Sequence, residues 1–168
     1  FYKNPVILSI FSGVLLTLSW PVQGLSFLIF FSLIPLFFVE NQITKGSSKR
    51  KKLRWFALSY LGFFVWNLGT TWWIVNSSVF GMTFAILCNT SFYAILMMLF
   101  HWSKKRLPLR TAYIFLVSLW IAFEKFHLMW DFSWPWLNLG NVFSEEIQWI
   151  QWYEFTGSFG GTLWVLLI

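Results

Sequence analysis

The sequence contains few charged residues. Only 11% of its 168 residues are charged, whereas a soluble globular domain carries about 25%. With so few charges the chain cannot cover its own surface with polar groups, and 58% of it is hydrophobic. This shortage argues against a soluble domain and favours a protein whose solvent is lipid.

Cysteine is almost absent as well. Cys88 is the single one, so no disulfide can form within the chain. It lies in an apolar run without a basic neighbour, which a reactive thiolate needs, so we expect a small buried hydrophobe. The two histidines are far apart and the carboxylates form no cluster, so the sequence predicts no metal site, and nothing in it predicts a cofactor.

The net charge of +6 comes mainly from two short loops. A basic chain can bind nucleic acid, but short basic loops beside apolar runs are typical of the cytoplasmic side of a membrane protein. We therefore expect no nucleic-acid partner, and contact with anionic lipid headgroups only as a side effect. The basic residues are Lys45, Lys49, Arg50, Lys51, Lys52 and Arg54 in the first loop, and Lys104, Lys105, Arg106 and Arg110 in the second.

The apolar runs predict an all-α membrane protein: a polytopic helical bundle with five complete transmembrane helices and the start of a sixth. The first two runs are near the lower length limit for a span and are expected to form a hairpin. The chain starts at Phe1 rather than Met, and its last run stops at Ile168 before it is long enough to span, so we expect a fragment of a longer protein. One N-terminal transmembrane domain is expected to cover residues 1–168, with helices at about 6–20, 25–39, 55–75, 79–102, 111–126 and 157–168.

The basic loops also predict an orientation. If both are cytoplasmic, the N-terminus is cytoplasmic too, which suits Lys3. The turns at 21–24 and 76–78 and the segment 127–155 then lie outside. This segment holds four of the six acidic residues and no Lys or Arg, so the charge bias is consistent along the chain.

Residues 127–155 are also rich in tryptophan. Pro135 and Gly140 interrupt any helix over 130–143, whereas 144–155 is predicted as a short helix that lies in the membrane interface. The tryptophans form either an aromatic belt, which composition alone favours, or the wall of a lipid-facing cleft.

Glu124 is the one acid inside an expected span. A carboxylate within the membrane is costly, which makes it a candidate for a functional site. The alternative is that it snorkels outward or pairs with Lys125 or His127. Asn67, with Thr70 and Thr71 in the third span, could bond to Glu124 or line a cavity, although such residues more often bond between helices. His101 is expected at the membrane interface.

Four runs of residues, in order along the chain, carry a resemblance to a known family. They are Ser19-Trp20-Pro21, Gly62-Phe63-Phe64-Val65-Trp66-Asn67-Leu68-Gly69, Trp134-Pro135-Trp136-Leu137-Asn138-Leu139-Gly140 and Thr156-Gly157-Ser158-Phe159-Gly160-Gly161. Together they resemble the N-terminal membrane domain of bacterial apolipoprotein N-acyltransferases. That family often has an arginine shortly after the glutamate that matches Glu124, where this chain has Lys125 and His127.

The resemblance implies an enzyme of the bacterial inner membrane that moves an acyl chain from a phospholipid to the N-terminal diacylglyceryl-cysteine of an apolipoprotein. In the family, a periplasmic domain of the carbon-nitrogen hydrolase type carries a Glu-Lys-Cys triad whose cysteine holds the acyl chain as a thioester. The chain contains none of the triad, so we expect it to be inactive alone, to anchor that domain and to shape lipid access. The candidate residues that face substrate or lipid are Glu124, Trp134, Pro135, Trp136 and Asn67.

Two other functions stay open on the sequence. A small transporter or channel would place Glu124 and Asn67 along a pathway, although no internal repeat is visible. A structural membrane scaffold would need only the aromatic belt.

Overall fold

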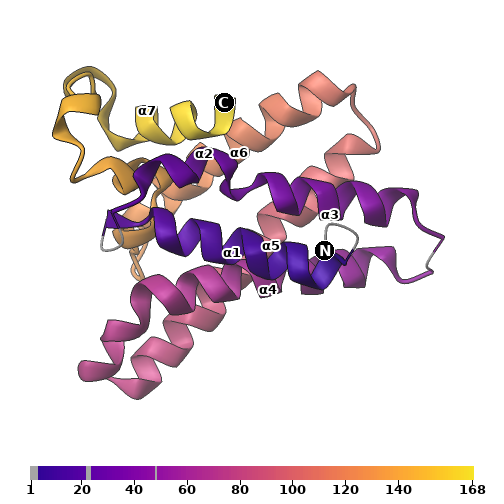
Figure 1. The fold of residues 1–168 in the computed structure, drawn as a ribbon, viewed down its shortest axis with the longest axis horizontal. Helices are drawn as coiled ribbons and strands as arrows, with labels where there is room; N and C mark the ends of the chain where they lie inside the picture. Colours follow the sequence, from indigo (N-terminus) through magenta and orange to yellow (C-terminus); the bar gives the residue numbers. More distant parts are fainter. Residues whose placement is uncertain (1–3, 22–23, 48) are drawn as a thin grey trace.

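The described part of the chain is helical, which confirms the all-α prediction. The computed structural model describes residues 4–21, 24–47 and 49–168, so Lys3 and the middle of the turn at 21–24 lie outside the described residues. No strand occurs in these ranges. The α-helices, drawn in Figure 1, are α1 (Pro5–Ser19), α2 (Ile29–Ser32), α3 (Ile34–Lys45), α4 (Lys51–Thr71), α5 (Val79–Lys104), α6 (Leu109–Met129) and α7 (Tyr153–Leu167).

Short 3₁₀ segments join several of these helices. They are η2 (Ser26–Leu28), η3 (Trp72–Asn76), η4 (Pro135–Leu137), η5 (Leu139–Phe143) and η6 (Ile147–Trp149). The elements η2, α2 and α3 follow one another closely and together form one stretch, Ser26–Lys45. The segments η4, η5 and η6 lie between α6 and α7. The stretch 130–143, which was expected to be irregular, therefore contains tight 3₁₀ turns.

Three stretches in the described residues are long and apolar enough to cross a membrane: Ser26–Lys45, α5 and α6. The helix α1 is apolar but has only 15 residues. The helix α4 has 21 residues but begins with a basic run. By length and composition the five complete spans expected from the sequence are therefore not confirmed.

The helices run further toward the basic loops than the apolar runs do. The run expected to end at Val39 continues as helix to Lys45, and α4 begins at Lys51 rather than at Trp55. Hydrophobicity marks only the part of a helix that suits lipid, whereas Lys, Arg, Gln and Glu are also good helix formers. The basic loop is consequently shorter than the sequence suggested.

Close contact between α1 and α4 forms the centre of the bundle. A Cβ atom at Gly13 would overlap the backbone oxygen of Gly62, and one at Gly69 would overlap the side chain of Thr17. Glycine at these positions lets the two backbones approach, as is common between helices in membranes. Next to this contact, Trp20 and Trp66 pack edge to face with their ring centroids 5.2 Å apart.

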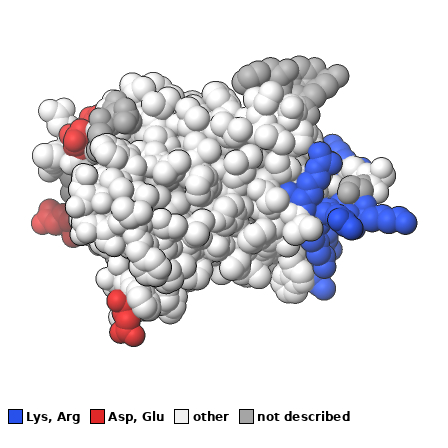
Figure 2. All heavy atoms as spheres, turned by 90° about the horizontal axis from the view of Figure 1, so that it is seen from below, with Lys and Arg blue, Asp and Glu red and all other residues white. Residues whose placement is uncertain are grey.

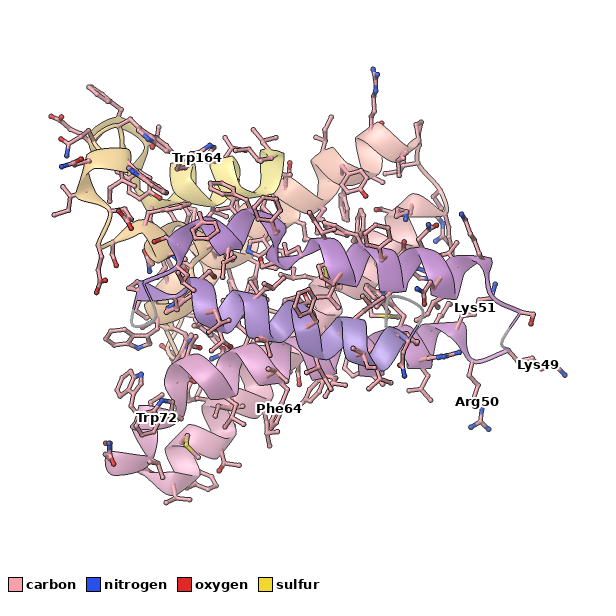
Figure 3. All side chains as sticks on the ribbon, in the orientation of Figure 1. Lys49, Arg50, Lys51, Phe64, Trp72 and Trp164 are labelled. Carbon is pink, nitrogen blue, oxygen red and sulfur yellow. The ribbon has the colours of Figure 1, made fainter. Side chains whose placement is uncertain are left out.

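The charged residues gather at opposite ends of the molecule. Figure 2 shows Lys and Arg at one end and Asp and Glu at the other. We call the end formed by residues 45–54 and 104–110 the basic end, and the end formed by residues 130–152, between α6 and α7, the acidic end. Figure 3 shows Lys49, Arg50 and Lys51 at the basic end and Trp72 toward the acidic end.

The prediction of an interfacial helix over 144–155 is wrong. This stretch contains η6 and a turn, and α7 begins at Tyr153. Its backbone hydrogen bonds join residues three positions apart, as in a 3₁₀ turn: Glu146 N donates to Phe143 O at 2.8 Å, and Trp149 N donates to Glu146 O at 2.8 Å. The hydroxyl of Tyr153 also donates to Gly140 O at 2.8 Å. Tertiary contacts thus hold the segment against the bundle and override its amphipathic pattern.

Candidate functional site at the acidic end

Glu124 lies in the interior of α6 and is almost completely buried. One carboxylate oxygen, Oε1, accepts hydrogen bonds from Leu139 N at 2.8 Å and from Trp120 Nε1 at 3.2 Å. The other, Oε2, accepts from Thr162 Oγ1 at 2.6 Å. The three donors come from α6, from η5 and from α7, so a single carboxylate joins all three elements (elements in Figure 1).

Gly140 completes this junction. Its N–H donates to Thr162 Oγ1 at 3.0 Å, and its carbonyl oxygen accepts from the Tyr153 hydroxyl at 2.8 Å. A Cβ atom at Gly140 would overlap the backbone oxygen of Ser158. The residue must therefore be glycine for the 139–143 turn to lie directly on α7. We call Glu124, Leu139, Gly140, Tyr153 and Thr162 the Glu124 junction.

The partners expected for Glu124 from the sequence are not the ones it has. Lys125 is exposed. His127 is buried and its Nε2 lies 2.8 Å from Asn89 Oδ1, on α5. The carboxylate neither snorkels outward nor pairs with either base, because neutral donors buried beside it already occupy both of its oxygens.

Asn67 does not reach Glu124 either. It is buried in α4, and its Nδ2 donates to Phe63 O of the same helix at 2.9 Å. Thr70 and Thr71 likewise donate to carbonyls of their own helix, at 2.8 and 2.6 Å. These short polar side chains donate to the backbone one turn back, as such residues often do within helices, and the Asn67 Oδ1 atom is left buried without a partner in the protein.

The three candidate residues before the junction differ in exposure. Trp134 is half-buried, and its backbone N–H donates to His127 O at 3.0 Å. Pro135 is exposed, and its carbonyl oxygen accepts from Asn141 Nδ2 at 2.7 Å. The Trp136 ring is 52% exposed and lies edge to face with Trp73, at 5.6 Å between centroids.

Trp136 lines an open pocket of about 370 Å³ at the acidic end. Trp20, Trp73, Thr70 and Thr71 line the same pocket. The pocket therefore brings together residues from α4, η3 and the Pro135–Leu137 turn. Trp136 therefore lines the same pocket as Thr70 and Thr71 of the third expected span. Glu124 does not line this pocket and belongs to the separate Glu124 junction.

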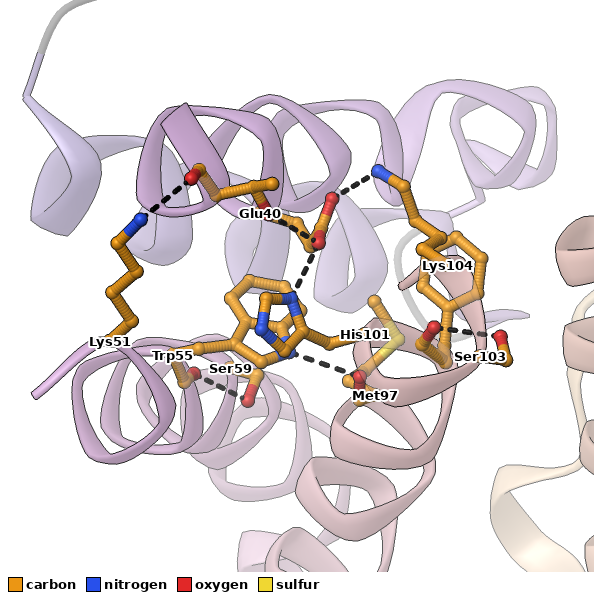
Figure 4. A network of polar contacts seen from close by, with 10 residues as sticks. Glu40, Lys51, Trp55, Ser59, Met97, His101, Ser103 and Lys104 are labelled. Carbon is orange, nitrogen blue, oxygen red and sulfur yellow. Dashed lines mark hydrogen bonds and ion pairs between the residues drawn. The ribbon is translucent and has the colours of Figure 1, made fainter. Parts of the chain in front are cut away.

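A second buried carboxylate, Glu40, was missed by the sequence analysis. It lies within α3, not in a loop, and its Oε1 accepts from Thr44 Oγ1 at 2.9 Å and lies 2.6 Å from His101 Nδ1. Its Oε2 pairs with Lys104 (Figure 4). His101, expected at the membrane interface, is buried within the protein against Glu40.

Helical spacing could have identified Glu40. The buried residues of α3 include Leu36, Val39, Glu40 and Ile43, which recur at intervals of three and four. The same pattern in α6 places Glu124 in line with Leu116, Trp120 and His127. By contrast, nothing in the spacing of Thr162 or Tyr153 predicted their roles.

The Glu124 junction can hold a structure in place, but it contains no nucleophile beside a base. Within the described residues no group of three or more His, Cys, Asp or Glu side chains could hold a metal ion. Cys88 is half-buried on α5 and does not contact the junction. The chemistry available here is hydrogen bonding and lipid contact.

Comparison with known proteins assigns the chain to a family. Residues 12–168 match the family described as apolipoprotein N-acyltransferase N-terminal domain. The chain is 28% identical over 168 residues to the apolipoprotein N-acyltransferase of Chlorobaculum tepidum; the match covers 98% of this chain and 30% of that relative, so the chain spans about 30% of the relative's length. No solved structure matches the chain. Because the family match covers most of the sequence, this chain belongs to the apolipoprotein N-acyltransferase family and corresponds to its N-terminal domain.

Proposed function

We propose that this chain is the membrane domain of an enzyme that transfers an acyl chain from a phospholipid to the N-terminal diacylglyceryl-cysteine of an apolipoprotein. The transfer passes through a thioester on the cysteine of a carbon-nitrogen hydrolase domain, which is not part of residues 1–168. The family match and the N-acyltransferase activity that names the relative support the reaction class. The membrane domain itself anchors the catalytic domain and shapes the route by which lipid reaches it.

The observation that carries this proposal is the Glu124 junction. It clamps the run from Trp134 to Gly140, which carries the family resemblance, between two helices. A buried carboxylate within a span is expensive, so its use to fix this turn indicates that the position of the turn matters. The turn presents Trp136 beside an open pocket, as a wall next to lipid would.

We place the basic end in the cytoplasm and the acidic end in the periplasm of a bacterial inner membrane. The separation of charge in Figure 2 supports this orientation. Single cysteines at Lys49 and at Glu145, each introduced into the full-length protein after Cys88→Ala and removal of other reactive cysteines, test it. A membrane-impermeant maleimide added to spheroplasts should label the cysteine at Glu145 and not the one at Lys49; the reverse pattern would overturn the orientation.

The role in lipid access is tested by two exposed tryptophans at opposite ends. Trp136 is 52% exposed at the acidic end and Trp102 is 48% exposed at the basic end. We expect Trp136→Ala in the full-length enzyme to lower the rate of lipoprotein N-acylation, measured by mass spectrometry of the lipoprotein N-terminus. Trp102→Ala serves as the matched control and should leave the rate unchanged at equal protein levels.

Equal acylation by both variants and the wild-type enzyme would remove Trp136 from the lipid route. A full-length protein that acylates no lipoprotein but moves a solute across vesicles would favour a transporter. An intact enzyme in which every acidic-end variant is fully active would favour a passive scaffold.

A further inference from the structure

A pocket of about 280 Å³ opens between α5, α6 and the first residues after α6. Its apolar wall is aromatic and includes Phe84, Phe92 and Phe132. The Phe132 ring lies 6.0 Å from the Phe84 ring, measured between centroids, and 5.5 Å from that of Trp130. Neither Glu124 nor Trp136 lines this pocket, so it is separate from the junction and from the pocket beside Trp136.

Four buried polar atoms of this wall have no hydrogen-bond partner in the protein. They are Asn89 Nδ2, His127 Nδ1, Trp130 Nε1 and Trp134 Nε1. Asn89 and His127 are each only 3% exposed. A buried polar group left without a partner costs about 1–3 kcal/mol. Their concentration around one pocket indicates that something occupying the pocket supplies their partners.

The contacts around these groups define the chemistry that they offer. His127 Nε2 lies 2.8 Å from Asn89 Oδ1, and because an amide oxygen only accepts, Nε2 is the donor. His127 Nδ1 is then left as an acceptor in the neutral ring. The amide nitrogen of Asn89 and the two indole nitrogens are donors. The residues that line the pocket thus carry three N–H donor groups and one acceptor that no protein atom satisfies.

We propose that this pocket binds the glycerol-ester region of a membrane lipid. An ester carbonyl oxygen accepts from the N–H donors, and a donor group of the lipid headgroup bonds to His127 Nδ1. The acyl chain lies over Phe84 and Phe132, which are both exposed large hydrophobic residues. No Lys or Arg lines the pocket, so neutral donors recognise the ester and the phosphate charge is not held there.

The binding test compares two lipids that differ only in the carbonyl. One is a diester phosphatidylethanolamine and the other is its diether analogue with the same headgroup and chains. The full-length protein in detergent, with its catalytic cysteine changed to alanine so that the diester is not consumed, should bind the diester about tenfold more tightly by native mass spectrometry, the size of effect expected from one net hydrogen bond. Equal binding of the two lipids by this protein with its pocket unaltered would overturn the proposal, and would mean that water fills the pocket.

Variants locate the preference in the pocket. The combined change Trp130→Phe and Trp134→Phe removes two donors and keeps the aromatic wall, so it should abolish the preference for the diester. Trp102→Phe at the basic end is the matched control and should keep it. A preference that persists in the pocket variant would show that the ester is recognised elsewhere. Thermal melting of each variant confirms that it is folded.

Cys88 supplies a second readout because it is half-buried and lines the same pocket. The diester lipid should slow alkylation of Cys88 by N-ethylmaleimide, followed on its own peptide by mass spectrometry, and the diether lipid should slow it less. Equal protection by both lipids would count against ester recognition. This binding test does not depend on acyl transfer, so its failure would leave the proposed reaction intact, and loss of acylation in Trp136→Ala would leave the pocket intact.

Discussion

Two glutamates are buried at opposite ends of the molecule, and different kinds of partner stabilise their carboxylates. Glu40, near the basic end, lies against the cation of Lys104 and the ring of His101. Glu124, near the acidic end, is held by neutral donors alone. The first is an ion pair whose cation is 20% exposed, and the second is a hydrogen-bonded carboxylate closed off from solvent.

The difference shows what each carboxylate holds together. Glu40 joins α3 to the last two turns of α5, and both are regular helices whose own backbone hydrogen bonds do not involve its side chain. Glu124 holds the start of the short 3₁₀ segment η5, because it accepts from the N–H of Leu139, the first residue of that segment. Replacing a carboxylate that accepts from an otherwise unpaired backbone N–H should cost more stability than replacing one that joins two helices with complete backbone hydrogen bonds.

Glu124→Ala should have the largest effect of the changes compared here. It leaves Leu139 N, Trp120 Nε1 and Thr162 Oγ1 without their acceptor, and each buried donor so left costs about 1–3 kcal/mol. We expect a loss of about 4 kcal/mol in the free energy of unfolding, measured as a shift of the thermal midpoint of the full-length protein in detergent. Glu154→Ala, at an exposed position of α7, is the control and should shift the midpoint little. A similar small shift for Glu124→Ala would show that the junction does not stabilise the fold.

Gly140→Ala should have the next largest effect. The added Cβ must displace Ser158, which separates the turn from α7 and weakens both hydrogen bonds of Gly140. Overpacking of this kind costs about 1–3 kcal/mol, and we expect the upper end of that range. Gly46→Ala at the basic end is the matched change, because its nearest neighbour would lie 3.3 Å away, at Gln42 O. Equal melting midpoints for the two variants would contradict the tight contact at Gly140.

The sequence identified one of the two buried glutamates and missed the other. Glu124 stood out because it is the one acid inside an expected span. Glu40 did not, because the hydrophobic run stops at Val39 and residue 40 fell just outside the expected span. The helix continues to Lys45 since polar residues are good helix formers and since α5 supplies the partners of Glu40.

The acidic end was predictable in position but not in detail. Pro135 and Gly140 correctly predicted that regular helix is interrupted there. The amphipathic pattern of 144–155 predicted a helix that does not form, because the segment is fixed to the bundle by contacts such as that of Tyr153 with Gly140. These contacts join residues that are distant along the chain, and periodicity carries no information about such pairs. Thr162 was missed for the same reason.

Glu40→Ala should cost less than Glu124→Ala, about 2 kcal/mol, because Lys104 can reach solvent once its partner is removed. Part of the cost is that of moving the Lys104 cation away from its lost partner, so a second change that removes the cation should recover that part. In Glu40→Ala with Lys104→Met, we expect the melting midpoint to move back toward that of the wild type. An additive loss in the double variant would show that Lys104 is stabilised by something other than Glu40.

The smallest expected effects come from one substitution made at both ends. Thr162→Val removes a hydroxyl that donates to Glu124 and accepts from Gly140 N, so two buried groups lose a partner. Thr44→Val removes a hydroxyl that only donates to Glu40, which keeps its partners on α5. We expect losses of about 2 kcal/mol and about 0.5 kcal/mol respectively, read from thermal midpoints under identical detergent conditions. Thr162→Ser, which keeps the hydroxyl, should recover most of the first loss. If Thr44→Val were the more damaging change, the basic end would depend on its hydrogen bonds as strongly as the acidic end, and the two glutamates would be equivalent after all.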